Sequence, residues 1–236
     1  MRVIAGLAKG IPLQAVEGDG TRPILDRVKE SLFSIILPNL VDANIIDIFA
    51  GTAALGIEAL SRGAKSCLFV DNSHKAAKTI KQNLGKTRLT DYAVIIEANV
   101  FTICENKKFC EHIGKQLNTS GLSSNDEPLP KPSDDSQKAT IGPNTEENLL
   151  RFDVVLVGAP YPIVEQPDTK ESLLLLFKRF VDEQIIQPDG IFVLQHRKED
   201  ITVQKELYNI EVFDTRIYGI TQITFLRPYT PIDISS

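Results

Sequence analysis

Residues 44–64, NIIDIFAGTAALGIEALSRGA, decide the fold of this 236-residue chain. A β-branched run at 45–48 is followed by a glycine-containing turn at 51–56, and a helical segment then continues to Gly63. A strand, a tight turn and a helix N-terminus in this order hold the polar part of a nucleotide-like ligand. Asp47 is expected to point out of the strand just before the turn.

The turn carries an incomplete glycine pattern. Gly51, Ala53 and Gly56 stand at the three glycine positions of G-x-G-x-x-G, with alanine in the middle. A glycine there lets the backbone approach the ligand, so the methyl group of Ala53 is expected to occupy limited space and to weaken cofactor binding.

Strands and helices alternate along the rest of the chain, which predicts βαβ units and a mostly parallel sheet. The tail predicts two strands, 210–213 and 217–226, whose short connection makes them antiparallel. An α/β fold that ends in a hairpin is therefore expected. The other predicted elements are helices at 26–37, 73–84 (capped by Gly85) and 170–181, and strands at 66–70, 92–97, 152–157 and 190–195.

Two segments fall outside this alternation. Residues 1–25 are predicted to be an N-terminal arm, in which the glycine-rich residues 1–23 form one hairpin and no core element. The main domain then spans 26–236. Within it, residues 118–146 are polar and are expected to be a disordered or mobile insertion, preceded by a helical stretch at 101–117.

Composition limits the function classes. The net charge of −5 argues against a protein that coats nucleic acid regardless of sequence, although it allows a local basic patch. Three cysteines without paired spacing favour a reducing compartment, and Cys110 with His112 supplies too few ligands for a metal site. The longest apolar run, 173–177, is too short to cross a membrane, and no secretory signal is recognised. We expect a cytoplasmic, monomeric protein without a metal or a membrane partner.

Parallel sheets bind ligands at the carboxyl ends of their strands, where the strand order reverses. This rule places four loops in one crevice, in which Asp71 is expected to accept hydrogen bonds from ribose hydroxyls and Asn99 to contact an adenine edge. The alternative is that the glycines only form turns and that Asp71 caps the next helix. The four loops are 47–56, 71–72, 98–99 and 158–161.

Several segments together resemble the RsmD family, bacterial enzymes that use S-adenosylmethionine to methylate the exocyclic N2 of one guanine in small-subunit ribosomal RNA. They are 2–6 (RVIAG), 21–23 (TRP), 26–34 (DRVKESLFS), 47–51 (DIFAG), 55–64 (LGIEALSRGA) and 218–219 (YG). The resemblance implies a Rossmann-like class I methyltransferase fold with a mostly parallel seven-stranded sheet, and ribosomal RNA or the assembling small subunit as partner.

The resemblance also assigns residues to the ligands. S-adenosylmethionine would be bound by Asp47, Phe49, Gly51, Thr52, Ala53, Gly56, Asp71, Asn72 and Asn99. The arm would face RNA through Arg2, Lys9, Arg22 and Arg27, which are otherwise scattered surface cations.

The family carries an Asp/Asn-Pro-Pro-Tyr/Phe motif after its fourth strand, and this chain has Gly158, Ala159, Pro160 and Tyr161 there. In the motif, a side-chain oxygen and a backbone carbonyl accept the two N–H bonds of the guanine amine, and the aromatic ring stacks on the base. Here the ring, one proline and the carbonyl of Ala159 remain, but the side-chain acceptor is missing. Loss of one such partner commonly lowers turnover by about 100- to 1000-fold.

Two hypotheses follow. The chain is a working, slow RNA methyltransferase, or it is a degenerate homologue that binds RNA or ribosomal precursors without methyl transfer. A nicotinamide dehydrogenase is disfavoured by the terminal hairpin and the Pro-Tyr loop. His196, which follows a predicted strand, is either a proton acceptor or RNA contact, or a surface histidine in a polar turn, and the second is favoured.

Overall fold

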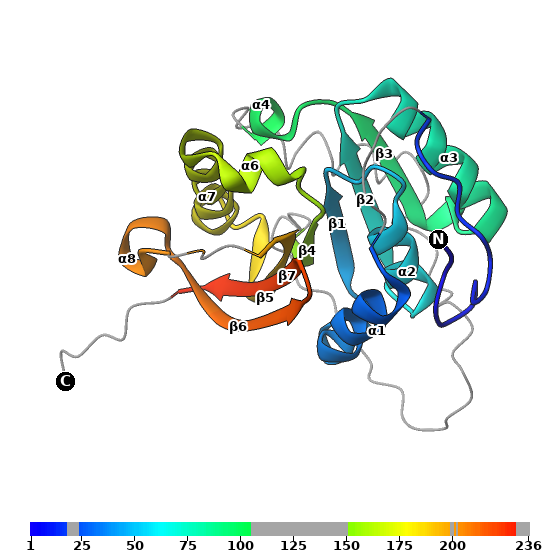
Figure 1. The fold of residues 1–236 in the computed structure, drawn as a ribbon, viewed down its shortest axis with the longest axis horizontal. Helices are drawn as coiled ribbons and strands as arrows, with labels where there is room; N and C mark the ends of the chain where they lie inside the picture. The colour runs from blue at the N-terminus through cyan, green and yellow to red at the C-terminus, as the bar shows by residue number, and fades with distance from the viewer. Residues whose placement is uncertain (18–23, 105–150, 199–200, 202, 230–236) are drawn as a thin grey trace, which may run out of the picture.

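Seven strands form one sheet in the order β3-β2-β1-β4-β5-β7-β6 (Figure 1). The computed structural model describes residues 1–17, 24–104, 151–198, 201 and 203–229. Strands β1 to β5 are parallel to one another, and β7 is antiparallel to both β5 and β6. The expected mostly parallel sheet with a terminal hairpin is therefore confirmed. The strands are β1 (Asn44–Ile48), β2 (Ser66–Asp71), β3 (Ala93–Glu97), β4 (Phe152–Val157), β5 (Ile186–Arg197), β6 (Ile210–Tyr218) and β7 (Thr221–Pro228).

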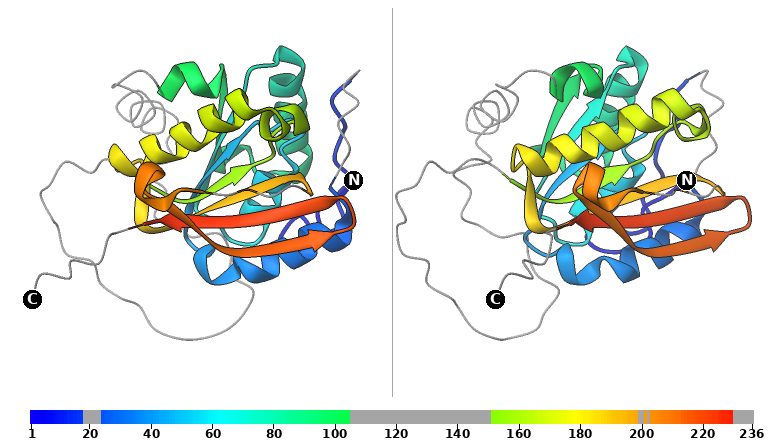
Figure 2. Two further views of the ribbon diagram at one scale, coloured as in Figure 1. Left: turned by 60° about the vertical axis from the view of Figure 1, so that its left-hand side comes forward. Right: turned by 90° about the vertical axis from the view of Figure 1, so that its left-hand side faces the viewer.

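Helices cover both faces of the sheet (Figure 2). Two apolar clusters fill the spaces between them: α1, α2 and α3 pack on one face, while α6 and α7 pack on the other, where Phe177 of α7 stacks on Phe192 of β5. The predicted helices at 26–37, 73–84 and 170–181 are confirmed. The helices are α1 (Asp26–Ile35), α2 (Ala54–Ser61), α3 (His74–Thr87), α4 (Val100–Cys104), α6 (Tyr161–Glu165), α7 (Pro167–Asp182) and α8 (Lys205–Tyr208), with 3-10 turns at Leu37–Asn39 and Thr90–Tyr92.

Some predicted boundaries differ from the structure. Gly85 lies inside α3, and the residue that ends this helix in the left-handed conformation is Arg88, with φ 58°. Strand β6 extends to Tyr218, so the hairpin turns around Gly219 and residues 217–218 belong to the earlier strand. Helix α4 covers the beginning of the predicted helix at 101–117, and the predicted insertion at 118–146 lies outside the described residues.

The N-terminal segment, residues 1–17, is part of the core, and the expectation that it contributes none is wrong. Its two halves pair through an antiparallel bridge between Arg2 and Pro12, as the predicted hairpin requires. Val3, Ala8 and Leu13 are 1%, 2% and 8% exposed and join the cluster that contains α1 and α2. These apolar residues stand five positions apart, which matches neither the period of a strand nor that of a helix, so no periodic pattern reveals them.

Glu58 of α2 holds this segment in place. Its two carboxylate oxygens accept backbone N–H bonds from Ile4 at 2.8 Å and Ala5 at 3.0 Å. They also contact Lys29 of α1 at 3.1 Å and Arg62 at 2.8 Å. Burial lowers the pKa of Lys29, although the charge of Glu58 opposes this change. Because Lys29 and Glu58 are both 0% exposed, removing either would leave a buried charge without its partner.

Candidate active site

The loops that follow β1, β2, β3 and β4 lie side by side along the edge of the sheet that the carboxyl ends of these strands form. Strands β2 and β3 are on one side of β1 and β4 is on the other, so the strand order reverses between β1 and β4. Neighbouring strand ends are joined there by backbone bonds: Ala98 N–H donates to the carbonyl of Asp71 at 2.9 Å, and Gly158 N–H donates to that of Ile48 at 3.3 Å. The structure thus brings the four predicted loops together at this edge, which we call the crevice edge.

Residues 49–53, the glycine loop, concentrate unusual backbone conformations. Phe49, Gly51 and Ala53 have φ values of 57°, 54° and 63°, all in the left-handed region. A Cβ placed on Gly51 would meet only the carbonyl oxygen of Phe49, at 3.9 Å. Glycine at 51 therefore serves the backbone conformation and leaves open space on that side of the loop.

Ala53 differs from its expected role. It is 0% exposed and belongs to the apolar cluster beneath α2, so its methyl group packs into the core. The sequence suggests that this methyl group occupies the ligand space, but the structure places it in the core. The cost of alanine here is conformational, because a left-handed φ favours glycine.

Asp47 is buried at 1% exposure, so the expectation that it points out of the strand is wrong. Its carboxylate accepts the N–H of Gly56 at 2.9 Å and ties β1 to the first turn of α2. Burial raises the pKa of Asp47 to about 8, opposed by the hydrogen bond from Gly56 and assisted by the charge of Asp71. Gly56 is required for packing, since a Cβ would lie 2.3 Å from the ring of Phe69.

Asp71 braces the glycine loop from the end of β2. One oxygen accepts the N–H of Gly51 at 2.8 Å and the other accepts that of Ser73 at 2.9 Å. The cap of α3 is Ser73 itself, whose hydroxyl accepts the N–H of Ala76. A carboxylate has about four acceptor sites, so half-buried Asp71 retains capacity for ligand hydroxyls, and exposed Asn72 follows it.

Asn99 begins α4. Its side-chain oxygen accepts the N–H of Phe101 at 3.0 Å, which leaves the amide nitrogen as the group for a ligand contact. The Phe101 ring lies 5.8 Å from the Phe49 ring, centre to centre, so the two rings form an apolar contact between the loops after β1 and β3. No sequence pattern identifies Phe101 as a site residue, because its role depends on this contact, which only the fold creates.

The loop from Gly158 to Tyr161 has room for a larger first residue. A Cβ placed on Gly158 would lie 3.5 Å from the carbonyl oxygen of Phe49, an ordinary contact, and its φ is not left-handed. Ala159 is 6% exposed, Pro160 is exposed and extended with φ −54° and ψ 138°, and half-buried Tyr161 starts α6. Neither the backbone nor the packing therefore requires glycine at 158.

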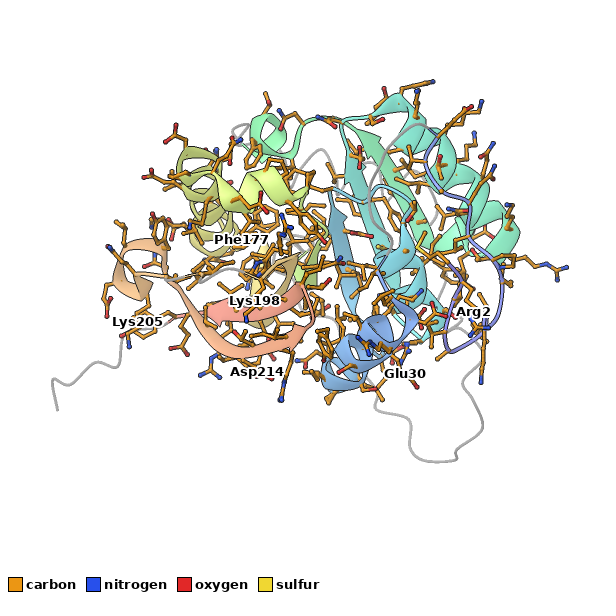
Figure 3. The ribbon with its side chains drawn as sticks, viewed as in Figure 1. Arg2, Glu30, Phe177, Lys198, Lys205 and Asp214 are labelled. Carbon is orange, nitrogen blue, oxygen red and sulfur yellow. The ribbon has the colours of Figure 1, made fainter. Side chains whose placement is uncertain are left out.

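Three of the four expected RNA-facing cations lie at the described surface. Arg2 is 64% exposed and pairs with Asp26 at 3.1 Å on the outside of the N-terminal segment (Figure 3). Lys9 and Arg27 are also exposed, and Arg22 lies outside the described residues.

His196 is not a surface residue, and that expectation is wrong. It is 0% exposed within β5, where Nε2 lies 2.9 Å from the hydroxyl of Thr224 on β7 and Nδ1 lies 2.6 Å from the carbonyl oxygen of Arg197. Burial lowers the pKa of His196 to about 4. Strand β5 continues to Arg197 between β4 and β7, which is why the residue is covered.

Two features are absent from the described residues. Within them, no helix is long and apolar enough to span a membrane. The same residues contain no group of three or more His, Cys, Asp or Glu side chains placed to hold a metal ion.

Comparisons with known proteins agree with this geometry. Residues 1–113 match a family model described as "Conserved hypothetical protein 95". The chain is 30% identical over 228 residues to "Putative rRNA methyltransferase YlbH" of Bacillus subtilis, covering 96% of this chain and 98% of that protein. It is 43% identical over 84 residues to "Ribosomal RNA small subunit methyltransferase D" of Haemophilus influenzae, covering 36% of this chain and 44% of that protein.

A solved structure extends the likeness in fold. "Putative methyltransferase yhhF" of Escherichia coli superposes with a TM-score of 0.67 at 20% identity, covering 97% of this chain and 98% of that one. At this identity the likeness concerns the fold alone. The full-length match to the Bacillus subtilis protein and the matches to ribosomal RNA small subunit methyltransferase D establish that the chain belongs to the RsmD family of methyltransferases.

Proposed function

We propose that this protein uses S-adenosylmethionine to methylate the exocyclic N2 of a guanine in small-subunit ribosomal RNA, acting as a monomer in the cytoplasm on RNA or on the assembling subunit. The observation that carries the proposal is the bond of 3.3 Å between Gly158 N–H and the carbonyl of Ile48, which holds the loop 158–161 beside the end of β1, where the glycine loop begins. A methyl donor in one loop and an acceptor base at the other would then be neighbours.

The crevice edge fits S-adenosylmethionine by the chemistry of its groups. Asp71 offers carboxylate lone pairs to ribose hydroxyls, the open side of Gly51 admits a close backbone approach, and the amide nitrogen of Asn99 suits an adenine edge. Phe49, Thr52 and Asn72 complete the set, while buried Asp47, Ala53 and Gly56 support the loop from beneath. S-adenosylmethionine supplies, when bound, a methyl group on a positively charged sulfur.

The target amine requires orientation more than proton abstraction, because its lone pair is drawn into the guanine ring. The carbonyl of Ala159 would accept one N–H, and the ring of Tyr161 would stack on the flipped base. A carbonyl oxygen, that of Phe49, is the atom closest to the position where the missing side chain of residue 158 would begin. We propose that this carbonyl substitutes in part for the family's acidic or amide residue.

A second candidate function is a degenerate homologue that binds RNA or ribosomal precursors without methyl transfer. Gly158 and Ala159, which replace the family's acceptor and first proline, support this alternative. Ala53, strained at a position suited to glycine, is consistent with it as well.

The deciding experiment incubates the protein with radiolabelled S-adenosylmethionine and small ribosomal subunits from a strain that lacks the corresponding methylation. We expect slow incorporation of the labelled methyl group into one guanine, which nuclease digestion and mass spectrometry would locate. No incorporation where a family member with the complete motif is active would contradict methyl transfer and favour the degenerate homologue. Incorporation at an adenine or a ribose would contradict the guanine N2 assignment alone.

A further inference from the structure

Helix α3 has an unusual charge for this chain. The whole sequence contains 31 acidic and 26 basic residues, yet His74–Thr87 includes four lysines and no Asp or Glu. Arg88 follows directly at the end of the helix. A helix without acidic residues in an acidic protein concentrates positive charge on its own surface.

These cations lie on the outward side of the helix. The buried residues Ala76, Ile80 and Leu84 face the sheet, whereas all five cations are exposed. The first three lysines are three residues apart, so each step advances about 4.5 Å along the axis. We call this set, Lys75, Lys78, Lys81, Lys86 and Arg88, the α3 basic row.

The charge of the row is not neutralised within the described part of the chain. No ion pair there includes a member of the row; Lys75 contacts the carbonyl oxygen of Glu17 at 3.5 Å and Lys86 the side-chain oxygen of Gln14 at 3.2 Å. Helix α7 behaves differently, since Lys178 pairs with Asp182 on the same helix.

The first turn of the row adjoins the cofactor side of the proposed site. Ser73 caps α3 directly after Asp71 and Asn72 at the crevice edge, and residues 14–17 of the N-terminal segment lie along the helix (Figure 1). A nucleotide strand whose base occupies the crevice would have its flanking phosphates within the field of this helix. Phosphate contacts from Lys and Arg position a nucleic acid without reading its sequence.

We infer that the α3 basic row binds the phosphate backbone of the RNA substrate. This inference rests on the proposed function and names a surface that the family motifs do not include. It also explains how a protein of net charge −5 would hold a polyanion: the contact is local, on one helix.

The test compares two triple variants with equal changes in net charge. The first is Lys75→Gln, Lys78→Gln and Lys81→Gln. The control is Lys65→Gln, Lys170→Gln and Lys205→Gln; Lys205 lies on α8, at the opposite end of the molecule from α3 (Figures 1 and 3). Filter binding to a small-subunit ribosomal RNA fragment is measured from about 50 to about 200 mM salt, a range over which phosphate contacts weaken strongly.

Binding by the α3 variant is expected to weaken by about tenfold or more, and its salt slope to fall by about 2, since each single-strand phosphate contact contributes about 0.7. The control should bind as the wild type does, and all three proteins should bind S-adenosylhomocysteine equally. Equal RNA binding by wild type and α3 variant would overturn the inference alone. Wild-type protein that binds anionic phospholipid vesicles and no RNA would overturn it together with the proposed RNA substrate.

Discussion

The side-chain amide of Asn83 donates a hydrogen bond to the carbonyl of Thr52 at 2.9 Å, which links the middle of α3 to the glycine loop. The same amide nitrogen donates to the carbonyl of Gln14 at 3.0 Å, and the side-chain oxygen accepts the Gln14 N–H at 2.7 Å. Asn83 is 0% exposed. One buried side chain therefore fixes both the glycine loop and the N-terminal segment.

We predict that Asn83→Asp lowers affinity for S-adenosylhomocysteine by about tenfold, because a carboxylate has no N–H to offer the carbonyls of Thr52 and Gln14. A buried group left without its partner costs about 1–3 kcal/mol, and about 1.4 kcal/mol corresponds to a factor of ten in affinity. Calorimetric titration, at a temperature well below the melting of both proteins, measures the change.

Thr87→Val is the matched control for this prediction. Thr87 is buried on the same helix, but its hydroxyl donates only to carbonyls of that helix, those of Asn83 and Leu84. The control should melt at a lower temperature with unchanged affinity. If Asn83→Asp also lost only thermal stability, Asn83 would have no role in the glycine loop's ligand site.

Two glycines should respond oppositely to alanine. Gly85→Ala is expected to stabilise the protein by about 0.5–1 kcal/mol, because Gly85 is inside α3 with open space around it, where alanine is the better helix former. Gly56→Ala should destabilise it by about 1–3 kcal/mol, because its Cβ would lie 2.3 Å from the Phe69 ring. Urea unfolding of both variants gives the two values. Destabilisation by Gly85→Ala would mean that Gly85 is a left-handed cap after all.

The sequence predicts the sheet, its terminal hairpin and the loops of the crevice edge because these depend on local patterns: alternating strands and helices, and polar residues at strand ends. It does not predict the burial of Val3 or the role of Asn83, whose partners are distant in the chain. The burial of His196 and Asp47 escapes the sequence patterns for a related reason. Each is a polar residue at a predicted strand end, and only the neighbouring strand and helix cover it.

Gly158→Asn is predicted to raise the rate of methyl transfer by about 100-fold, since it restores a side-chain acceptor for the amine of the proposed guanine substrate at a position with room for it. The Michaelis constant for S-adenosylmethionine should not change, because the substitution concerns the target base. Gly158→Ala, which adds volume without an acceptor, is the control and should leave the rate near that of the wild type. Equal rates for all three proteins would show that residue 158 does not contact the amine.

Asp47 and His196 should give the stability of the fold an unusual dependence on pH. The pKa of Asp47 rises from 3.8 to about 8 on folding, so its contribution is complete below about pH 4 and is lost as the pH rises through 8. The pKa of His196 falls from 6.5 to about 4, so its contribution is complete above 6.5 and is lost as the pH falls through 4. Between pH 4 and 6.5, Asp47 lowers and His196 raises the free energy of unfolding as the pH rises, so their contributions oppose each other.

Above pH 6.5 only Asp47 of this pair still titrates, and the free energy of unfolding should therefore decline from pH 6.5 to 8, by up to about 1.4 kcal/mol per pH unit. Asp47→Asn should flatten this decline, because the amide oxygen can still accept the Gly56 N–H and nothing ionises. His196→Gln should leave the decline intact and change only the acid side. Urea unfolding of the wild type and both variants at half-unit pH steps separates the contribution of Asp47 from that of His196. Equal slopes for the wild type and Asp47→Asn from pH 6.5 to 8 would mean that Asp47 is already ionised in the folded protein at pH 6.5, held charged by the hydrogen bond from Gly56 despite its burial.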